Sequence, residues 1–233
     1  MTKLARFAAA TVIAVLWHCG NSTGPDATPA VPTSLSPAVT NPFYPLTPGS
    51  ITVFRAQTAD GVEIDSIFVL ANTKVVHGFE AREVHDRVYL ADSLKEDTYD
   101  WFAQDSAGNV WYLGEDTKEY AHGVVVSTAG TWQWGVHDAV PGIIVWGDTA
   151  GVVGKLYRQE FDPGNAQDVG KVIAFNQTVV VPFGTLTGCI KTEEWSTLES
   201  GPHDNKYYCP QVGTALEVAG ETGERTELMT KTP

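Results

Sequence analysis

Basic side chains are scarce in this chain of 233 residues, which has 15 lysines and arginines against 28 aspartates and glutamates. Its formal net charge is −13 at pH 7. Phosphate backbones and anionic lipid headgroups repel a protein with this charge, and the composition supplies hardly any basic patch to offset the repulsion. We therefore expect no nucleic-acid partner.

Long apolar runs are also lacking, apart from residues 7–17 near the start of the chain. This run follows Lys3 and Arg6 and precedes a polar stretch that begins at Cys19. Its 11 residues are fewer than the roughly 20 that a membrane-spanning helix needs. A basic start, a short apolar run and small polar residues are the order of a secretory signal. We expect residues 1–18 to be a signal peptide and the protein to be exported.

The residues around Cys19 resemble the lipidation sequence of bacterial lipoproteins, in which Leu or Val and two small residues precede the modified cysteine. Leu16 fits, whereas Trp17 and His18 stand where small residues are usual. The resemblance implies a lipid on Cys19 and a place at the periplasmic or extracellular face of a bacterial membrane. An ordinary signal peptide cut nearby is the alternative. Removal of residues 1–18 leaves 13 basic and 28 acidic residues, a net charge of −15.

Cysteine is rare, with three residues in the chain. If Cys19 carries lipid, Cys189 and Cys209 remain as a pair in a compartment where disulfides persist. We expect these two to form a disulfide, which would contribute roughly 3 kcal/mol by closing a loop of about 20 residues. Neither stands in a C-x-x-C or beside a patterned pair of histidines, so no metal site is expected.

Proline is concentrated near the start, because seven of the 13 prolines lie between residues 20 and 48. Ser, Thr and Ala separate them, and such a segment buries too little apolar surface to offset the entropy of ordering it. We expect residues 19–48 to be a lipid-bearing tether whose end, residues 41–46, docks onto the domain that follows. Residues 49–233 would form that domain.

Helical periodicity is scarce after residue 49. Apolar and polar residues alternate instead, with β-branched and aromatic side chains and with Gly, Asp and Asn turns between the runs. The alternation predicts strands near 50–56, 61–71, 79–91, 97–105, 109–114, 119–127, 130–135, 155–161, 170–181, 187–195, 204–209 and 212–218. Residues 139–146 indicate a buried loop or a short strand. We expect an all-β, mainly antiparallel domain, folded as a single barrel-like or strongly curved sheet.

Five stretches carry a resemblance: residues 41–49 (NPFYPLTPG), 97–105 (DTYDWFAQD), 108–115 (GNVWYLGE), 157–161 (YRQEF) and 206–213 (KYYCPQVG). Together they resemble a family of uncharacterised exported bacterial lipoproteins. The last stretch is also similar to the closing strand of curved-sheet envelope proteins with the shape of lipoprotein carriers, although Cys209 replaces Ala and Gln211 replaces Gly. The resemblance implies a fold and not an activity. Gln211 also puts the backbone of that turn in question, since Gly accepts positive φ more readily.

Aromatic and acidic residues alternate on two neighbouring predicted strands. Trp101 and Asp105 share one face of residues 97–105, and Trp111 and Glu115 are expected to share one face of the next strand. Rings beside carboxylates are typical of sugar or cation sites. Packing between strands with solvated rims is the alternative.

Arg158 and Glu160 stand two residues apart and therefore on one face of a strand. An inward guanidinium would hold a carboxylate through two hydrogen bonds, whereas an outward one would form a surface ion pair. The candidate ligand-binding residues are Trp101, Asp105, Trp111, Glu115, Arg158 and Glu160.

Catalytic motifs are missing, since there is no nucleophile elbow, phosphate loop or metal-ligand pattern, and no cofactor is expected. Glycosidic cleavage would need two carboxyls about 5–10 Å apart. Its weak candidates are Asp100, Asp105, Glu115, Glu160 and Glu194. The sequence therefore favours an exported, lipid-anchored protein that binds a small molecule, glycan, lipid or partner. A secreted polysaccharide-active enzyme and a structural envelope protein without a ligand are the alternatives.

Overall fold

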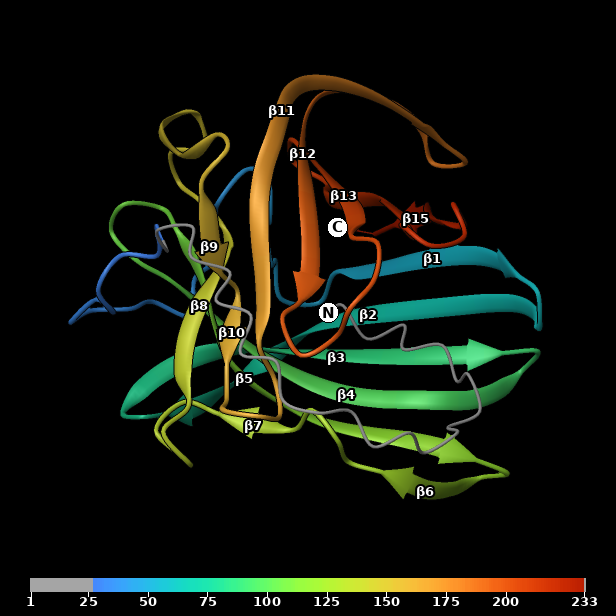
Figure 1. The fold of residues 1–233 in the computed structure, drawn as a ribbon, viewed down its shortest axis with the longest axis horizontal. Coiled ribbons are helices and arrows are strands. Elements are labelled where there is room, and N and C mark those ends of the chain that lie inside the picture. Colours follow the sequence, from blue (N-terminus) through green and yellow to red (C-terminus); the bar gives the residue numbers. More distant parts are fainter. Residues whose placement is uncertain (1–26, 233) are drawn as a thin grey trace.

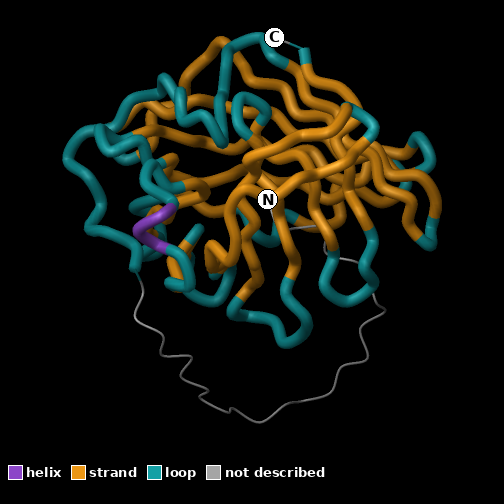
Figure 2. Tube along the Cα trace, turned by 90° about the horizontal axis from the view of Figure 1, so that it is seen from above, coloured by secondary structure: helices purple, strands orange, loops and turns teal. Residues whose placement is uncertain are grey.

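The computed structural model describes residues 27–232, which consist almost entirely of strands and turns. A 3-10 turn at Ala150–Val152 is the purple segment in Figure 2. No helix in this part of the chain is long and apolar enough to cross a membrane. The strands are β1 (Ile51–Thr58), β2 (Gly61–Val76), β3 (Phe79–Leu90), β4 (Ser93–Gln104), β5 (Val110–Ala121), β6 (Val124–Ser127), β7 (Trp132–Gln133), β8 (Val140–Val145), β9 (Leu156–Arg158), β10 (Glu160–Phe161), β11 (Asp168–Val181), β12 (Gly184–Ser196), β13 (Asp204–Cys209), β14 (Gly213–Val218) and β15 (Arg225–Lys231).

The strands form one antiparallel sheet that curls back on itself. Its order is β10-β8-β5-β4-β3-β2-β1-β15-β14-β13-β12-β11-β9, with β6 and β7 paired to β5. The two ends of this path, β10 and β9, are separated in the chain only by Gln159, so the sheet nearly closes into a barrel. In Figure 1, β1 to β4 run across the molecule while β11 and β12 stand at a steep angle to them. The predicted all-β, antiparallel, barrel-like fold is confirmed.

Near-closure brings β8 so close to the turn between β9 and β10 that a side chain would not fit. A Cβ atom on Gly142 would collide with the backbone carbonyl groups of Arg158 and Gln159. Glycine lets two backbones approach where any other residue would hold them apart. Gly142 therefore permits the two ends of the sheet to meet.

Strands β4 and β5 are packed on both faces. Phe102 and Tyr112 belong to one apolar cluster, whereas Trp101 and Trp111 belong to another. A strand covered on both sides loses the clean alternation of a half-exposed one. This explains why neither face of residues 97–105 is clearly apolar in the sequence.

The proline-rich residues from 27 to 48 lie against the sheet. Val39, Tyr44 and Leu46 are buried in the same cluster as Phe102. The side-chain amide of Asn41 donates hydrogen bonds to two backbone carbonyls of the domain, at 2.8 and 3.1 Å. The segment therefore contributes to the core from which the candidate site is built.

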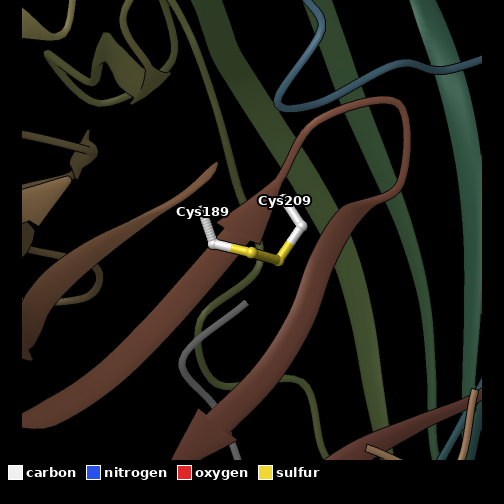
Figure 3. Close-up of a disulfide and its surroundings, with 2 residues drawn as sticks. All are labelled: Cys189 and Cys209. Carbon is white, nitrogen blue, oxygen red and sulfur yellow. A yellow bond between two sulfur atoms is a disulfide. The ribbon is translucent and has the colours of Figure 1, made fainter. Parts of the chain in front are cut away.

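Strands β12 and β13 are joined covalently by a disulfide between Cys189 and Cys209 (Figure 3). The prediction of this pair is confirmed. In the turn that follows β13, Gln211 has a φ of 64°, so this turn adopts the left-handed backbone although it lacks glycine. The bond fixes the register of the two strands that carry part of the cavity described below.

Strand β15 was not predicted, because its side chains hardly alternate between apolar and polar. Leu228 is its one buried residue, with Arg225, Glu227 and Lys231 along the same strand. Pairing to β1 on one side and β14 on the other fixes it in the sheet. Backbone hydrogen bonds of this kind leave little trace in the sequence.

Candidate functional site

Inside the barrel lies a cavity of about 110 Å³. At roughly 10–15 Å³ for each water, this space holds several waters or one small ligand. Strands around most of the sheet contribute to its lining, and one part of the wall is apolar, with Leu46, Ile67, Val69 and Ile144. The ionisable side chains of the wall are Asp65, Asp86, Glu96, Asp100, Glu115, Glu194, Glu217, Lys206 and Lys231. Acids outnumber bases, so the cavity favours positive charge.

Four of these carboxyls form a diagonal row across β2, β3, β4 and β5. Asp86 lies two residues along β3 from the residue that pairs with Asp65, and Asp100 lies two residues along β4 from the residue that pairs with Asp86. Asp100 itself pairs with Glu115. Side chains at such positions on one face of an antiparallel sheet are neighbours. Glu96 also lines the cavity from β4. We call these five residues the acidic wall.

Burial favours the protonated form of the three aspartates and of Glu96 in the acidic wall. It is the largest cause of the raised pKa of Asp86, and the charge of Asp65 and a hydrogen bond between the two add to it. Burial followed by the charges of Glu115 and Asp86 raises the pKa of Asp100. The same cause raises the pKa of Asp65 to about 6 and that of Glu96 to about 7. Neighbouring buried carboxyls do not all ionise unless a cation joins them.

Hydroxyl groups satisfy only part of the acidic wall. The Tyr112 hydroxyl lies 2.5 Å from Asp100 Oδ1 and 3.1 Å from Glu115 Oε2, and its one proton serves one of them at a time. The Thr98 hydroxyl donates to Glu96 Oε1 at 2.9 Å. At Asp100, the Tyr112 hydroxyl therefore reaches only one of the two carboxyl oxygens.

Three buried oxygens of the acidic wall have no hydrogen-bond partner among the described residues: Asp65 Oδ1, Asp86 Oδ1 and Asp100 Oδ2. Asp86 is 8% exposed and Asp100 is 0% exposed. Leaving such an acceptor without a partner costs about 1–3 kcal/mol, and most buried polar atoms avoid it. All three residues line the cavity, so a molecule bound there can reach these oxygens.

A second group of charges lines the cavity from β12, β13 and β14. Lys206 Nζ lies 3.4 Å from Glu194 Oε2 and 3.6 Å from Glu217 Oε2. Glu194 Oε1 accepts hydrogen bonds from the hydroxyls of Thr192 at 2.7 Å and Tyr208 at 2.9 Å. We call Glu194, Lys206 and Glu217 the lysine cluster.

The members of the lysine cluster stabilise one another's charged forms. Burial alone would raise the pKa of Glu194, but Lys206 and the hydrogen bonds it accepts lower that pKa. Burial raises the pKa of Glu217, and Lys206 opposes this rise. The two carboxylates in turn raise the pKa of Lys206 against the effect of burial. Its charges therefore already have partners within the protein.

Three of the residues singled out from the sequence meet at the cavity: Asp100, Glu115 and Glu194. Trp101 and Glu115 also border a second pocket beside Lys74. The indole of Trp101 donates to Glu83 Oε2 at 3.2 Å. Trp101 thus lies on the opposite side of β4 from Asp100.

The other candidates lie outside the cavity lining. Trp111 is 0% exposed, and its indole donates to Asp105 Oδ2 at 2.8 Å. Glu160 Oε2 accepts a hydrogen bond of 2.6 Å from the indole of Trp132. Arg158 Nε donates to a backbone carbonyl at 3.2 Å. These contacts join neighbouring strands and turns.

A β-bulge separates two residues that alternation places together. Trp111 and Glu115 were expected on one face of their strand, and this prediction is wrong. The register between β4 and β5 skips Leu113, and Gly114 follows with a φ of 142°. One extra residue reverses the alternation of everything beyond it. Glu115 therefore lies opposite Asp100 at the cavity.

The sequence analysis missed Asp65, Asp86, Glu96, Lys206 and Glu217 as candidates. A signal for Asp86 was present, because Val84 and Val88 stand two residues to either side, and a carboxyl between them shares an apolar face. A charged residue on such a face is unusual unless it is paired or functional. The described residues contain no group of three or more His, Cys, Asp or Glu placed to hold a metal ion.

No protein-family model matches this chain, and no curated protein matches it. A crystal structure of a "putative lipoprotein" from Parabacteroides distasonis ATCC 8503 is similar to it over 82% of this chain and 98% of that chain, with 13% sequence identity and a TM-score of 0.39. A likeness this distant does not indicate a shared function. Membership of the lipoprotein family suggested by the five motifs stays a prediction.

Proposed function

We propose that this protein is an exported binding protein, anchored to a membrane through lipid on Cys19, that holds a small ligand in the cavity of its barrel. Residues 1–18 act as the signal, and the chain after Cys19 links the lipid to the β domain. Residues 1–26 lie outside the described part of the structure, so export and anchoring rest on the sequence. Ligand binding rests on the cavity.

The observation that carries the binding function is the set of buried, unpartnered oxygens on Asp65, Asp86 and Asp100, of which the last two belong to the more deeply buried residues. A fold selected for stability alone would fill this space or pair these groups, because each open acceptor is costly. Small-ligand sites combine apolar walls with a few converging polar groups, as this cavity does. A space of about 110 Å³ suits a small ligand better than a polysaccharide chain.

Blocking the cavity tests this function. Thr226 lines the cavity from β15, whereas Thr230 on the same strand is exposed and does not line it. We expect small-molecule ligands found by thermal shift to lose their effect in Thr226→Trp and to keep it in Thr230→Trp. A ligand at 100 times its Kd adds about 2.7 kcal/mol to stability, which such a shift reports. Shifts of equal size in both variants would contradict binding in the cavity.

Anchoring is tested by fractionation of cells that produce the full chain. We expect the protein in the membrane fraction and Cys19→Ala in the soluble exported fraction, because a lipid chain supplies the membrane affinity. Soluble wild-type protein would favour an ordinary signal peptide instead.

A further inference from the structure

We propose that the ligand of the cavity is a small alkylammonium ion, whose positive group binds between the carboxyls of Asp86 and Asp100 while its chain lies against the apolar wall. This inference rests on the proposed function and names the chemical class of its ligand.

Asp86 and Asp100 have no cationic partner in the part of the chain that the structure describes. The charges that act most strongly on each are those of other carboxyls. Lys206 lies across the cavity and is engaged by Glu194 and Glu217. A bound cation would therefore complete the wall without competing with a side chain.

The free oxygens suit an ammonium group. Asp86 and Asp100 occupy diagonal positions on adjacent strands, with side chains on the same face. Such diagonal neighbours lie within about 7–8 Å of each other, so one –NH₃⁺ with three donors can bridge them. The described residues supply no set of ligands for a metal ion, and the apolar wall formed by Leu46, Ile67 and Val69 suits a hydrocarbon chain.

Binding of an ammonium ion ionises the carboxyls that hold it. Each carboxyl that is protonated in the free protein releases its proton to solvent when the cation binds, so binding weakens as pH falls. The groups that face these two aspartates are Asp65 from β2, Glu96 from β4, Tyr112 and Glu115 from β5, Glu194 from β12, Lys206 and Tyr208 from β13, Glu217 from β14, Lys231 from β15 and Tyr44 from the N-terminal segment. Most of these groups are acids, so the dependence of binding on pH follows the titration of the carboxyls, and affinity falls as pH falls.

Three probes with the same four-carbon chain isolate the role of charge: 1-butylamine, 1-butanol and butanoate. Calorimetric titration of the purified protein at pH 8 is expected to show binding of butylamine at least about tenfold tighter than that of butanol, and no binding of butanoate. Butylamine affinity is expected to fall at least about tenfold at pH 5. Titrations in buffers with different ionisation enthalpies should show proton release.

Asp86→Asn and Asp100→Asn each keep the shape of the side chain and are expected to weaken butylamine binding about tenfold or more. Asp116→Asn is the matched control, because Asp116 pairs with Lys118 on β5 and does not line the cavity. It should leave the affinity unchanged. The thermal melting of each variant checks that it is folded.

The outcomes separate this inference from the proposed function. Equal binding of butylamine and butanol, tighter binding of butanoate, or full affinity in both aspartate variants would overturn the ammonium site. Binding of a neutral or anionic compound that Thr226→Trp blocks would then still support a ligand cavity. If Thr226→Trp changes the binding of no compound, both the ammonium site and the ligand cavity would be overturned.

Discussion

The acidic wall and the lysine cluster face the same cavity and use the same kind of side chain, yet burial has opposite outcomes for them. Lys206 and three hydroxyl or amide groups lower the pKa of Glu194, whereas no cationic side chain among the described residues pairs with Asp86 or Asp100, whose pKa burial raises. The lysine cluster is complete within the protein. The acidic wall has open oxygens on Asp65, Asp86 and Asp100, and the proposed cation would bind at Asp86 and Asp100.

This contrast distinguishes charged groups that are buried to stabilise the fold from charged groups that are buried to bind a ligand. A buried ion pair with its hydrogen bonds in place holds neighbouring strands together, as Lys206 holds β12, β13 and β14. Buried acceptors without partners reduce stability, and such groups are retained where a ligand uses them. The cavity therefore has one wall that maintains the barrel and one wall available for binding.

The largest predicted effect is on the lysine cluster. Lys206→Met leaves Glu194 and Glu217 buried without their cation, and we expect a loss of about 3–5 kcal/mol in the free energy of unfolding. Denaturant unfolding measures it. Lys191→Met on the neighbouring strand is the control, since Lys191 Nζ lies over the ring of Tyr207, 5.4 Å from its centre, and the variant should cost less than about 1 kcal/mol. Equal losses in both variants would contradict a structural role for the cluster.

The disulfide should stabilise the lysine side of the cavity more than the acidic side. Replacing Cys189 and Cys209 together by Ala opens a loop with a sequence separation of 20. We expect a loss of about 3 kcal/mol in unfolding free energy. Hydrogen exchange should quicken first in β12 and β13 and later in β3 and β4. Equal acceleration throughout would show that the two walls open as one unit.

The disulfide was predictable from the sequence because only two cysteines remain beside the lipidation candidate. The barrel was predictable because apolar and polar residues alternate along residues 51–58, following the pleat of β1, and because turn residues separate the strands that follow. Strand β15 was not predictable from the sequence, since it is fixed by backbone pairing and carries one buried side chain. Patterns of side chains reveal a strand only where one face is covered.

The candidate site was predictable only in part. Asp100 and Glu115 were singled out, but their meeting depends on the bulge beside Gly114, which no periodicity of 2 can show. Asp65 and Asp86 join them through pairing of separate strands. Which residues meet across four strands depends on the pairing register, and the whole sheet sets that register.

Stability should fall as pH rises, and Glu96 should carry part of this fall. Its pKa is raised from 4.5 to about 7 in the folded protein. Between these values the folded state binds more protons than the unfolded state, so the free energy of unfolding decreases with rising pH. Asp65 acts in the same direction from 3.8 to about 6, whereas Glu194, whose pKa is lowered, loses stability only as pH falls below its ordinary value.

Glu96→Gln removes this titration and should reduce the difference in unfolding free energy between pH 5 and pH 8 by roughly 1–2 kcal/mol, because each pKa unit corresponds to about 1.4 kcal/mol and Glu96 is partly exposed. Denaturant unfolding at the two pH values measures the difference. Glu221→Gln, in an exposed turn, should leave it unchanged. An identical pH dependence in wild type and Glu96→Gln would mean that Glu96 does not titrate in this range.

The smallest predicted effect is a gain. Asp86→Asn replaces a carboxyl with a neutral amide that can donate to Asp65, so the free energy of unfolding at pH 8 should increase by about 1 kcal/mol. The gain should shrink as pH falls, because burial raises the pKa of Asp86 and favours its protonated form. The same variant is expected to lose alkylammonium binding, which would make Asp86 a residue retained at the expense of stability. A loss of stability at pH 8 would show instead that Asp86 supports the barrel as Lys206 does, and the distinction between the two walls would fail.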